Sequence, residues 1–342
     1  MELESIMEES VELLEKSFYN KKFYYSYSSL NKLLWSPQVF YQLYVLGLKE
    51  ERMEQHLLQG KLIHLLLLEP EKFNQKFIMT PLTLPKDNLK VVIDRVYHHH
   101  AELKRNGDER AELAEFEGAI LDVMKDMNYH QSLKTDQQRL DKIITPEGIS
   151  YWSFLQKKGD KTLVDAETYK YCSDAVEIIK TNDKVCKLIG CSISEFENKK
   201  VINELEASVD FSSKSYGLKG IIDNVVIDHD EKMIYINDIK TTSKELKDFS
   251  ESVEYYSYWL QAVIYMIMVN FLFNDLLGQG YQVKFHFVVI DKMFQSYAFP
   301  VSEETLNKWL DRFHQCIEKA EWHLKNKSYE LPYEFANSLV VL

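Results

Sequence analysis

The chain has 342 residues, of which 45% are hydrophobic and 27% are charged, with only 11 Gly and 7 Pro. This composition is typical of a folded globular protein and excludes a chain that is disordered over most of its length. The formal net charge of −12 argues against a surface that coats nucleic acid non-specifically, although a DNA enzyme whose lysines gather in one groove remains compatible with it.

Two features of the sequence indicate the cellular compartment of the protein. The N-terminus, MELESIMEESVELLEK, is acidic and lacks the apolar segment of a secretory signal peptide. The four cysteines, Cys172, Cys186, Cys191 and Cys316, have neither a CxxC spacing nor the spacing of a zinc site. We therefore expect reduced thiols and a cytoplasmic location.

The first 80 residues are predicted to be helical with two short breaks. Ser28 or Ser29 is suited to cap a helix over Leu30–Trp35, because serine side chains accept hydrogen bonds from free backbone N–H groups. Pro37 is suited to the first turn of the next helix. Both features predict short helices before residue 50.

A strongly apolar helix is predicted over residues 53–68. It should end just before Pro70, since the residue that precedes a proline avoids helical dihedral angles. The loop Thr80–Asp87 follows, and residues 88–200 are predicted to be mostly helical and charged, with an interruption near Thr145–Gly148.

From Val201 onward the hydrophobic pattern changes to a period of two. The predicted elements are a strand over Val201–Phe211, a hairpin of Ile221–Asp228 with Met233–Lys240, a helix over 255–273, a strand over 282–290 and a helix over 302–326. This order predicts an α/β core over residues 201–342. The mostly helical half, residues 1–200, is expected to form one integrated domain with it.

The helix predicted over 255–273 has an alternative interpretation. Its nineteen residues carry no charge and approach the length of a membrane span. However, Ser257, Gln261 and Asn270 lie within it, and its flanks are acidic rather than basic. A buried core helix is the interpretation that we adopt.

The predicted hairpin brings two carboxylates together. If residues 229–232 form the loop, Asp228 lies opposite Met233, and five positions further back Asp223 lies opposite Asp238. Directly opposed residues point to the same face, and Lys240 joins them because side chains alternate along a strand. The remaining residues expected on this face are Ile221, Val225, Ile227, Ile234 and Ile236.

Two opposed carboxylates on an apolar surface repel each other and are poorly solvated. A divalent cation relieves this repulsion, and Mg²⁺ commonly takes one or two carboxylates from a protein. Lys240 could then position the attacking water or stabilise charge on a phosphodiester. The alternative, a surface salt-bridge cluster, stays open, because Asp-x-Lys and Glu-x-Lys recur elsewhere and a one-residue slip would separate the aspartates.

Other polar residues stand on apolar elements. His64 lies in the leucine-rich helix with Gly60 one turn earlier, where a ligand or another backbone could approach; a hydrogen-bonded core histidine is the alternative. Gln261 and Tyr265 share one helix face and need polar partners, from the site or from the core.

Two glutamates, Glu204 and Glu206, alternate along the predicted strand Val201–Phe211 and so share one of its faces. One of them could join the acidic cluster while the other is solvated. The run His98–His100 lies among charged residues of a predicted helix, and we expect it to be a solvated surface feature.

Taken in order, His64, Asp223, Asp238-x-Lys240 and Gln261-x-x-x-Tyr265 resemble the PD-(D/E)XK nuclease superfamily. The branch with the RecE exonuclease and the RecB nuclease domain is the most similar. Two further segments resemble RecE-like phage and prophage exonucleases. They are Ser28-Ser29-Leu30 leading to Ser36-Pro37-x-x-Phe40, and Gly60-x-x-x-His64 leading to Leu68-Glu69-Pro70-x-x-Phe73.

This resemblance implies a restriction-endonuclease-like core sheet flanked by helices, to which the N-terminal half contributes the His64 helix. It implies that Asp223, Asp238 and Lys240 are catalytic, and that His64, Asp223, Asp238 and the Ile239 carbonyl bind Mg²⁺, for which Mn²⁺ can substitute. Gln261, Tyr265 and Glu206 are expected to support the site or bind DNA.

The implied activity is exonucleolytic hydrolysis of linear double-stranded DNA that prepares ends for recombination. The implied origin is a phage or prophage. The implied partners are DNA ends, a single-strand annealing protein and further copies of the chain, in a homo-oligomer that could be a ring. An endonuclease on the same core and a non-catalytic DNA-binding or protein-docking module are the alternatives. Two departures from the family pattern stand out: Ile222 replaces a basic residue, and no N-terminal cysteine is present to complete an iron–sulfur cluster.

Overall fold

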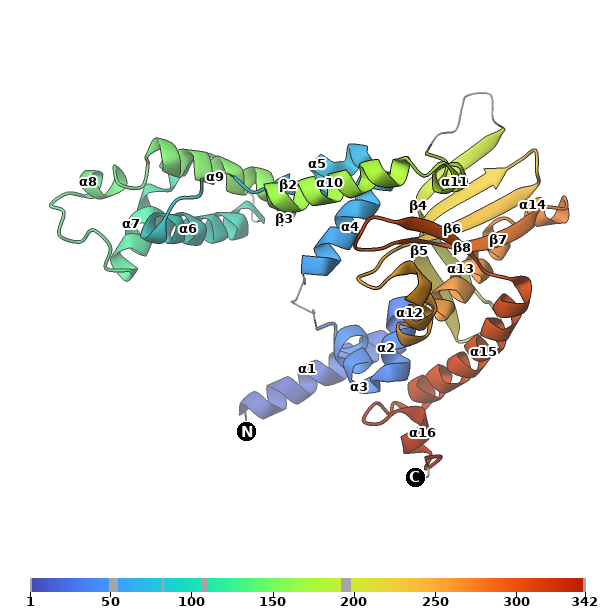
Figure 1. The fold of residues 1–342 in the computed structure, drawn as a ribbon. Coiled ribbons are helices and arrows are strands. Elements are labelled where there is room, and N and C mark those ends of the chain that lie inside the picture. Colours follow the sequence, from blue (N-terminus) through green and yellow to red (C-terminus); the bar gives the residue numbers. More distant parts are fainter. Residues whose placement is uncertain (1, 49–54, 82, 106–109, 192–197, 341–342) are drawn as a thin grey trace. The chain divides into compact units, whose positions relative to one another are not determined.

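The computed structural model describes residues 2–48, 55–81, 83–105, 110–191 and 198–340 (Figure 1). It divides the chain into two compact units. The first comprises Met1–Pro70 and Tyr171–Leu342, and the second comprises Glu71–Lys170. The helical half expected for residues 1–200 is thus shared between the two units, and all the expected site residues belong to the first.

A six-stranded mixed sheet forms the centre of the first unit. Its strands are β1 (Phe23–Tyr25), β4 (Lys199–Asp210), β5 (Tyr216–Asp228), β6 (Met233–Thr241), β7 (Gln282–Ile290) and β8 (Ser296–Pro300). Strand β5 pairs with antiparallel β4 along its length, with parallel β1 near its start and with antiparallel β6 near its end. Strand β7 lies parallel to β6, and β8 follows it. The sequence predicted four of these strands, and β1 and β8 are additions.

The register of the β5–β6 hairpin confirms the prediction from the sequence. Asp228 pairs with Met233, and residues 229–232 form the loop. The ladder between the two strands ends at the pair Asn224–Asn237, one position before Asp223 and Asp238. The two aspartates therefore lie where the hydrogen-bonded pairing of β5 and β6 stops.

The core face of this hairpin differs from the prediction at one end. Ile221 was expected on it but is 47% exposed, and Ile222 takes the fully buried position instead. Side chains of β5 should alternate between the two faces of the sheet, but two residues, Asp223 and Asn224, separate the core residue Ile222 from the next core residue, Val225. The other apolar residues expected on this face are in the core as predicted: Val225, Ile227, Ile234 and Ile236.

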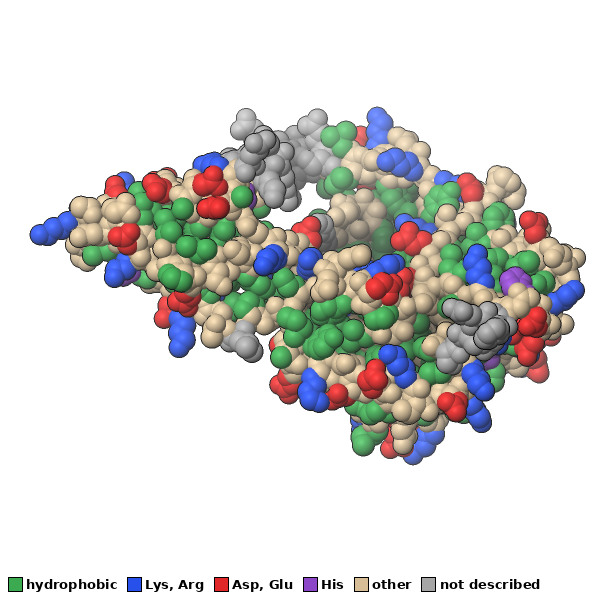
Figure 2. All heavy atoms as spheres, turned by 90° about the horizontal axis from the view of Figure 1, so that it is seen from above, with side chains coloured by type: hydrophobic (Ala, Val, Ile, Leu, Met, Phe, Trp, Pro, Cys, Tyr) green, Lys and Arg blue, Asp and Glu red, His purple; other side chains and the backbone are tan. Residues whose placement is uncertain are grey.

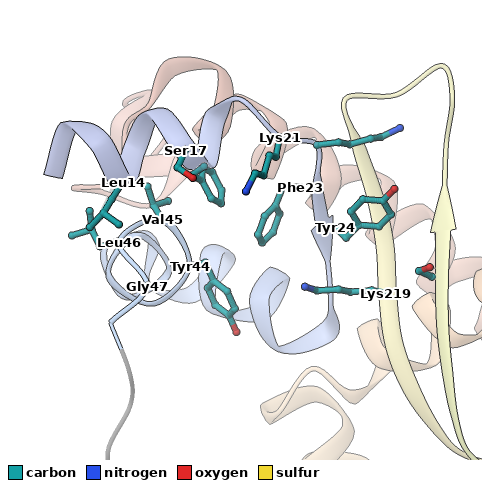
Figure 3. A pocket seen from close by; sticks show the side chains of 13 residues that line it. Leu14, Ser17, Lys21, Phe23, Tyr24, Tyr44, Val45, Leu46, Gly47 and Lys219 are labelled. Carbon is teal, nitrogen blue, oxygen red and sulfur yellow. The ribbon is translucent and has the colours of Figure 1, made fainter. Parts of the chain in front are cut away.

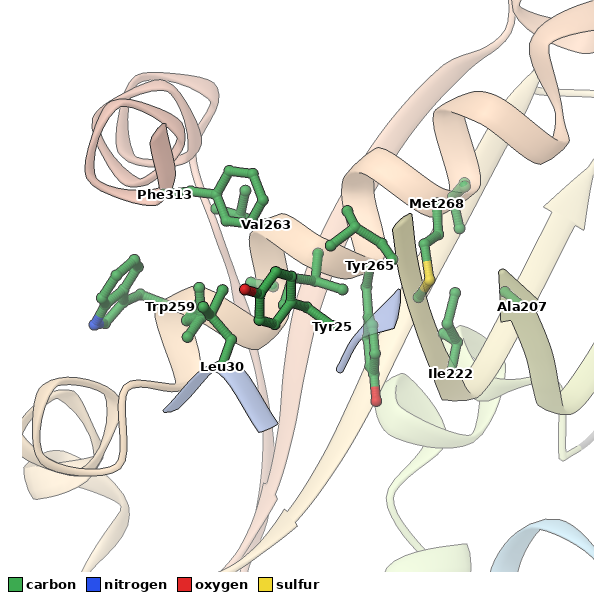
Figure 4. Packing of buried hydrophobic residues seen from close by; sticks show 14 of the residues in the cluster. Tyr25, Leu30, Ala207, Ile222, Trp259, Val263, Tyr265, Met268 and Phe313 are labelled. Atoms are coloured by element: carbon green, nitrogen blue, oxygen red, sulfur yellow. The ribbon is translucent and has the colours of Figure 1, made fainter. Parts of the chain in front are cut away.

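Helix α13 (Tyr258–Leu272) covers this face, and α15 (Glu303–Asn326) packs on α13 (Figure 1). Figure 4 shows Met268 of α13 beside Ile222 and Ala207 of the sheet. The helix predicted over 255–273 is divided by Ser257, whose φ of +57° ends the run of α12 (Phe249–Tyr255) before α13 begins. Among the described helices, none is long and apolar enough to cross a membrane.

The N-terminal elements of the first unit pack against the same core. Helix α2 (Tyr27–Trp35) is capped by Ser26, which forms a capping box with Ser29, so the predicted cap at Ser28 or Ser29 is two or three residues late. Pro37 begins α3 (Pro37–Phe40), as predicted. The unit also contains α1 (Glu2–Tyr19), the π-helix η1 (Tyr41–Val45), α4 (Gln55–Leu68), α11 (Asp183–Ile189), η4 (Leu246–Asp248), α14 (Asn274–Gly278) and α16 (Tyr333–Ala336).

The second unit is mainly helical and has its own core around Phe116, Ile120 and Trp152. Its elements are η2 (Pro70–Lys72), α5 (Phe73–Lys76), β2 (Phe77–Met79), α6 (Asp87–Arg105), η3 (Leu113–Phe116), α7 (Glu117–Asp126), α8 (Asp136–Leu140), α9 (Pro146–Lys158), β3 (Thr162–Val164) and the start of α10 (Ala166–Lys180). The prediction of a solvated histidine run is wrong for His100, which is 2% exposed and has its ring 4.8 Å from that of Phe116.

Candidate metal centre

Helix α4 carries His64 to the sheet, where it contacts β5 and β6. Residues 53 and 54 of the predicted helix lie outside the described residues, and the helix ends at Leu68, as the proline at position 70 predicts. Gly60 permits a close approach, because a Cβ atom there would lie 3.1 Å from Thr241 Oγ1 at the end of β6. The close neighbour of Gly60 is thus a side chain, whereas another backbone or a ligand was expected there.

Three side chains from three elements converge beside this helix. His64 of α4, Glu204 of β4 and Asp223 of β5 each offer one ligand atom, and these atoms lie within 4.8 Å of one another. His64 Nδ1 is 3.7 Å from Asp223 Oδ2. An imidazole nitrogen with two carboxylate oxygens is a donor set that suits a divalent cation.

Glu204 reaches this cluster from an unusual backbone conformation. It lies between the β4–β5 pairs that join Asn203 to Asn224 and Leu205 to Ile222, so it is opposite Asp223. Its φ is +48°, which is in the left-handed region that non-glycine residues seldom occupy in a strand. Such strain costs about 1–3 kcal/mol and is often found at functional sites.

Asp238 and Lys240 follow on the neighbouring strand, β6. The backbone N–H of Ile239 donates a 2.7 Å hydrogen bond to Asp223 Oδ2, and it joins the two strands beyond the end of their ladder. Lys240 Nζ lies 2.5 Å from Asp238 Oδ2 and 4.8 Å from the centre of the Tyr258 ring. The structure thus brings His64, Asp223, Asp238 and Lys240 to one place.

The charges at this site are set by burial and by their mutual attraction. Burial raises the pKa of both aspartates, that of Asp238 to about 6, and the Lys240 ammonium opposes this rise. Burial lowers the pKa of Lys240, but the two aspartates outweigh it and the net pKa is raised. Burial and then Lys240 lower the pKa of His64 to about 4. At neutral pH the lysine is therefore charged, and the imidazole is neutral with a free lone pair.

These residues fit a divalent cation. Asp238 is fully buried, and its Oδ1 has no hydrogen-bond donor among the described residues, although Lys240 lies against Oδ2. A buried carboxylate oxygen without a donor is costly unless a cation balances it. The cluster of His64, Glu204 and Asp223 supplies the nitrogen and oxygen ligands, and Asp238 lies beside it, close enough to interact electrostatically with His64 and Asp223.

A row of three asparagines, of which Asn224 and Asn237 are buried, links the strands of the site to the helices around it. Asn237 donates to Asn224 Oδ1, and Asn224 donates to Asn203 Oδ1, each over 2.7 Å. Asn203 also donates to the Leu68 carbonyl at the end of α4 over 2.7 Å. Asn224 and Asn237 in turn donate to the carbonyls of Ile189 and Leu188 in α11. The sequence analysis did not identify this row, for which three asparagines within predicted strands would have been the signal.

Gln261 and Tyr265 lie on α13 and are both buried. Gln261 donates to the Tyr265 hydroxyl over 2.8 Å, and that hydroxyl donates to the Ile221 carbonyl of β5 over 2.5 Å. The pair therefore holds the strand that carries Asp223. Their polar groups thus bond to each other and to the backbone of Ile221, which is two residues before Asp223 of the carboxylate cluster.

Glu206, the glutamate expected to support the site, is exposed and lies opposite Ile221. The structure does not bring it to the cluster, and Glu204 lies there instead. Alternation along a regular strand gives both glutamates the same face, so the sequence pattern could not separate them. The distinction depends on the register of β4 against β5, because only Glu204 is opposite Asp223.

The chain was compared with protein families, solved structures and curated proteins. The family model of the PD-(D/E)XK nuclease superfamily matches residues 24–330. Among solved structures, the chain is similar to a "Putative exonuclease" from Eubacterium rectale, with 12% identity and a TM-score of 0.43 over 91% of this chain and 83% of that one. No curated protein matches the chain.

Proposed function

The chain belongs to the PD-(D/E)XK nuclease superfamily, and we propose that it is a Mg²⁺-dependent DNA exonuclease that shortens linear duplex DNA from its ends. The observation that carries the proposal is the convergence of His64, Glu204 and Asp223 next to the buried Asp238, which is paired with Lys240. Metal-assisted phosphodiester hydrolysis uses a ligand set for a cation, and a separate positive charge near the scissile phosphate assists it; these residues are suited to both roles.

The cation would be held by His64, Asp223, Asp238 and the Ile239 carbonyl, with Glu204 as a further ligand in place of Glu206. When bound, a divalent cation lowers the pKa of water and offsets phosphate charge. His64 is suited to its role because its imidazole is neutral at physiological pH. Asp223 is held in place by the Ile239 N–H, so its second oxygen is free to face the cation.

Lys240 would stabilise the negative charge that develops on the phosphate during cleavage. Its raised pKa keeps it protonated, so it acts as a cation rather than as a base that accepts a proton. Asp238 on one side and the Tyr258 ring on the other restrict where its ammonium group can lie. A positioned charge in a buried site stabilises a transition state more than the same charge in water.

The acidic chain needs a way to hold DNA. On the face shown in Figure 2, acidic and basic side chains are interspersed, and the net charge is −12. Affinity for duplex DNA depends largely on lysine and arginine that neutralise phosphates. We therefore propose a homo-oligomer, in the form of a ring as in RecE-like enzymes, that gathers basic groups in a channel. Action in recombination with a single-strand annealing protein, in a phage-infected cytoplasm, belongs to the same proposal.

The test compares end-labelled linear duplex with covalently closed circular DNA of the same sequence, with Mg²⁺ and with excess chelator. The proposal requires that linear DNA be shortened from its ends only with Mg²⁺, that circles survive, and that Asp238→Ala be inactive. Glu251→Ala is the control, because Glu251 is an exposed acid of α12 that pairs with Lys244 outside the site. Cleavage of circles at the linear rate would favour an endonuclease, and binding without any cleavage would favour a non-catalytic module.

A further inference from the structure

A cavity of about 530 Å³ lies in the first unit between α1, β1, η1 and the edge of the β4–β5 pair (Figure 3). Three of the side chains that line it are lysines. None of its thirteen lining residues is acidic, although the chain has 53 acidic residues against 41 lysines and arginines. In a protein with this excess of acid, a lysine-lined cavity without carboxylates marks a local preference for an anion.

Two of the lysines are available to such an anion. Lys22 is paired with Asp210 and also donates to the Phe211 carbonyl. Lys21 and Lys219 are exposed, and neither has an acidic partner among the described residues. Figure 3 shows both side chains extending toward Phe23 and Tyr44, Lys21 from the turn after α1 and Lys219 from β5.

Aromatic rings form the wall between these lysines. Phe23 and Tyr44 pack edge to face in this wall, with ring centroids 6.2 Å apart, and both line the cavity. Tyr24 covers Gly217 of β5, where a Cβ atom would lie 2.5 Å from its ring. Rings beside lysines are the combination that binds the bases and the backbone of single-stranded nucleic acid.

An open strip of the sheet connects this cavity to the metal centre. Lys219, Ile221 and Asp223 alternate along β5 on the face opposite α13, since Leu218, Gly220 and Ile222 face that helix. Their partners on β4 are Ser208, Glu206 and Glu204. Lys219 and Ile221 are exposed, so the strip is open to solvent over the roughly 13 Å that four strand residues span.

We propose that this cavity binds a nucleotide of single-stranded DNA that extends along the strip from the metal centre. Lys21 and Lys219 bind its phosphate, and the rings of Phe23 and Tyr44 contact its base. A base inside a duplex is not accessible to a cavity of this kind, so the ligand is an unpaired strand. The inference rests on the proposed function, because it assigns the path of the strand whose other part occupies the cleavage site.

Fluorescence anisotropy with a labelled oligothymidylate, in chelator so that nothing is cleaved, tests the proposal. The double substitution Lys21→Gln with Lys219→Gln should reduce the slope of log affinity against log salt by about 0.7, since the two lysines bind one phosphate and each neutralised phosphate accounts for about 0.7 on a single strand. Lys292→Gln with Lys325→Gln, two exposed lysines outside the cavity, should leave the slope unchanged. An unchanged slope in the cavity variant would overturn the proposal.

Two further arms define the ligand. An abasic strand of equal length should bind the parental protein about tenfold more weakly than oligothymidylate, because it cannot contact the rings. Equal affinity for the two would overturn the assignment of the base. Glu206→Gln should raise the affinity for oligothymidylate, because it removes the negative charge on the strip. A duplex that binds as tightly as the single strand, and that loses as much affinity in the lysine variant, would overturn the single-strand assignment.

A separate measurement tells failure of this inference from failure of the proposed function. Hydrolysis of a small phosphodiester by the parental protein with Mn²⁺ requires the metal centre. The substrate itself is too small to extend from there to the cavity. Absence of that hydrolysis counts against the nuclease proposal, whereas the anisotropy result alone decides whether the cavity binds a strand.

Discussion

The amide of Asn203 on β4 donates a hydrogen bond to the carbonyl oxygen of Leu68, the last residue of α4. This contact ties the end of the helix that carries His64 to the residue next to Glu204. One half-buried amide thereby links the elements that carry two candidate ligands from distant parts of the sequence. The bond belongs to the row through Asn224 and Asn237, and the row as a whole links three strands to two helices.

Asn224→Ala should lower the free energy of unfolding by about 2–4 kcal/mol. Asn224 is fully buried, and its loss removes the side-chain donor to the Ile189 carbonyl and one of the two acceptors of the Asn237 amide. Urea unfolding of the metal-free protein measures the change. Asn326→Ala is the control, since that amide is exposed on α15 and should cost less than about 0.5 kcal/mol. Equal losses for the two variants would contradict the structural role of the row.

Lys240→Met should reduce turnover about 100-fold or more while Mn²⁺ affinity stays within a few-fold of the parental value. Methionine keeps most of the volume of the side chain but removes the charge that stabilises the transition state. Single-turnover cleavage and calorimetric Mn²⁺ titration separate the two effects. If the variant instead binds Mn²⁺ as weakly as Asp223→Ala does, Lys240 acts mainly by ordering the ligands.

Cleavage at sub-saturating Mn²⁺ should fall as the pH drops below about 6, because protons compete with the cation for Asp238, whose pKa is about 6. The His64 imidazole, with a pKa of about 4, stays neutral over this range. More Mn²⁺ should move the fall to lower pH, since the cation then competes better. A fall whose position does not depend on Mn²⁺ would assign it to another group.

Thermal stabilisation by Mn²⁺ should be larger at pH 8 than at pH 5. The folded-state pKa of Asp238, about 6, lies above the value of about 3.9 for an unfolded aspartate. The metal-free folded state therefore bears the full cost of the buried charge above pH 6 and none of it below pH 3.9. Cation binding relieves that cost where it is greatest. Melting temperatures with and without Mn²⁺ at both pH values measure the effect, and a larger shift at pH 5 would contradict it.

The sequence predicted the part of the site that depends on local patterns. A four-residue loop between two strands determines the register, so the opposition of Asp223 and Asp238 follows from counting along the hairpin. The apolar helix that ends before Pro70 likewise follows from propensity and proline sterics. His64 is brought to the sheet by tertiary packing, however, and only the family resemblance indicated that contact.

The features that the sequence did not reveal depend on irregular backbone. The left-handed conformation of Glu204 and the shift of sides between Ile222 and Val225 interrupt the period of two on which strand predictions rest. For the same reason Ile221 was assigned to the core and Glu206 to the site. The short strand β1 carries only three residues, too few for a periodic signal.

The central claim is that Glu204, together with His64 and Asp223, holds a divalent cation. Mn²⁺ titration followed by electron paramagnetic resonance tests it most directly on two variants of β4. The structure predicts that Glu204→Gln weakens Mn²⁺ binding roughly tenfold or more, whereas Glu206→Gln, two residues along the same strand, binds as the parental protein does. Parental affinity in Glu204→Gln, or an equal loss in both variants, would contradict the account.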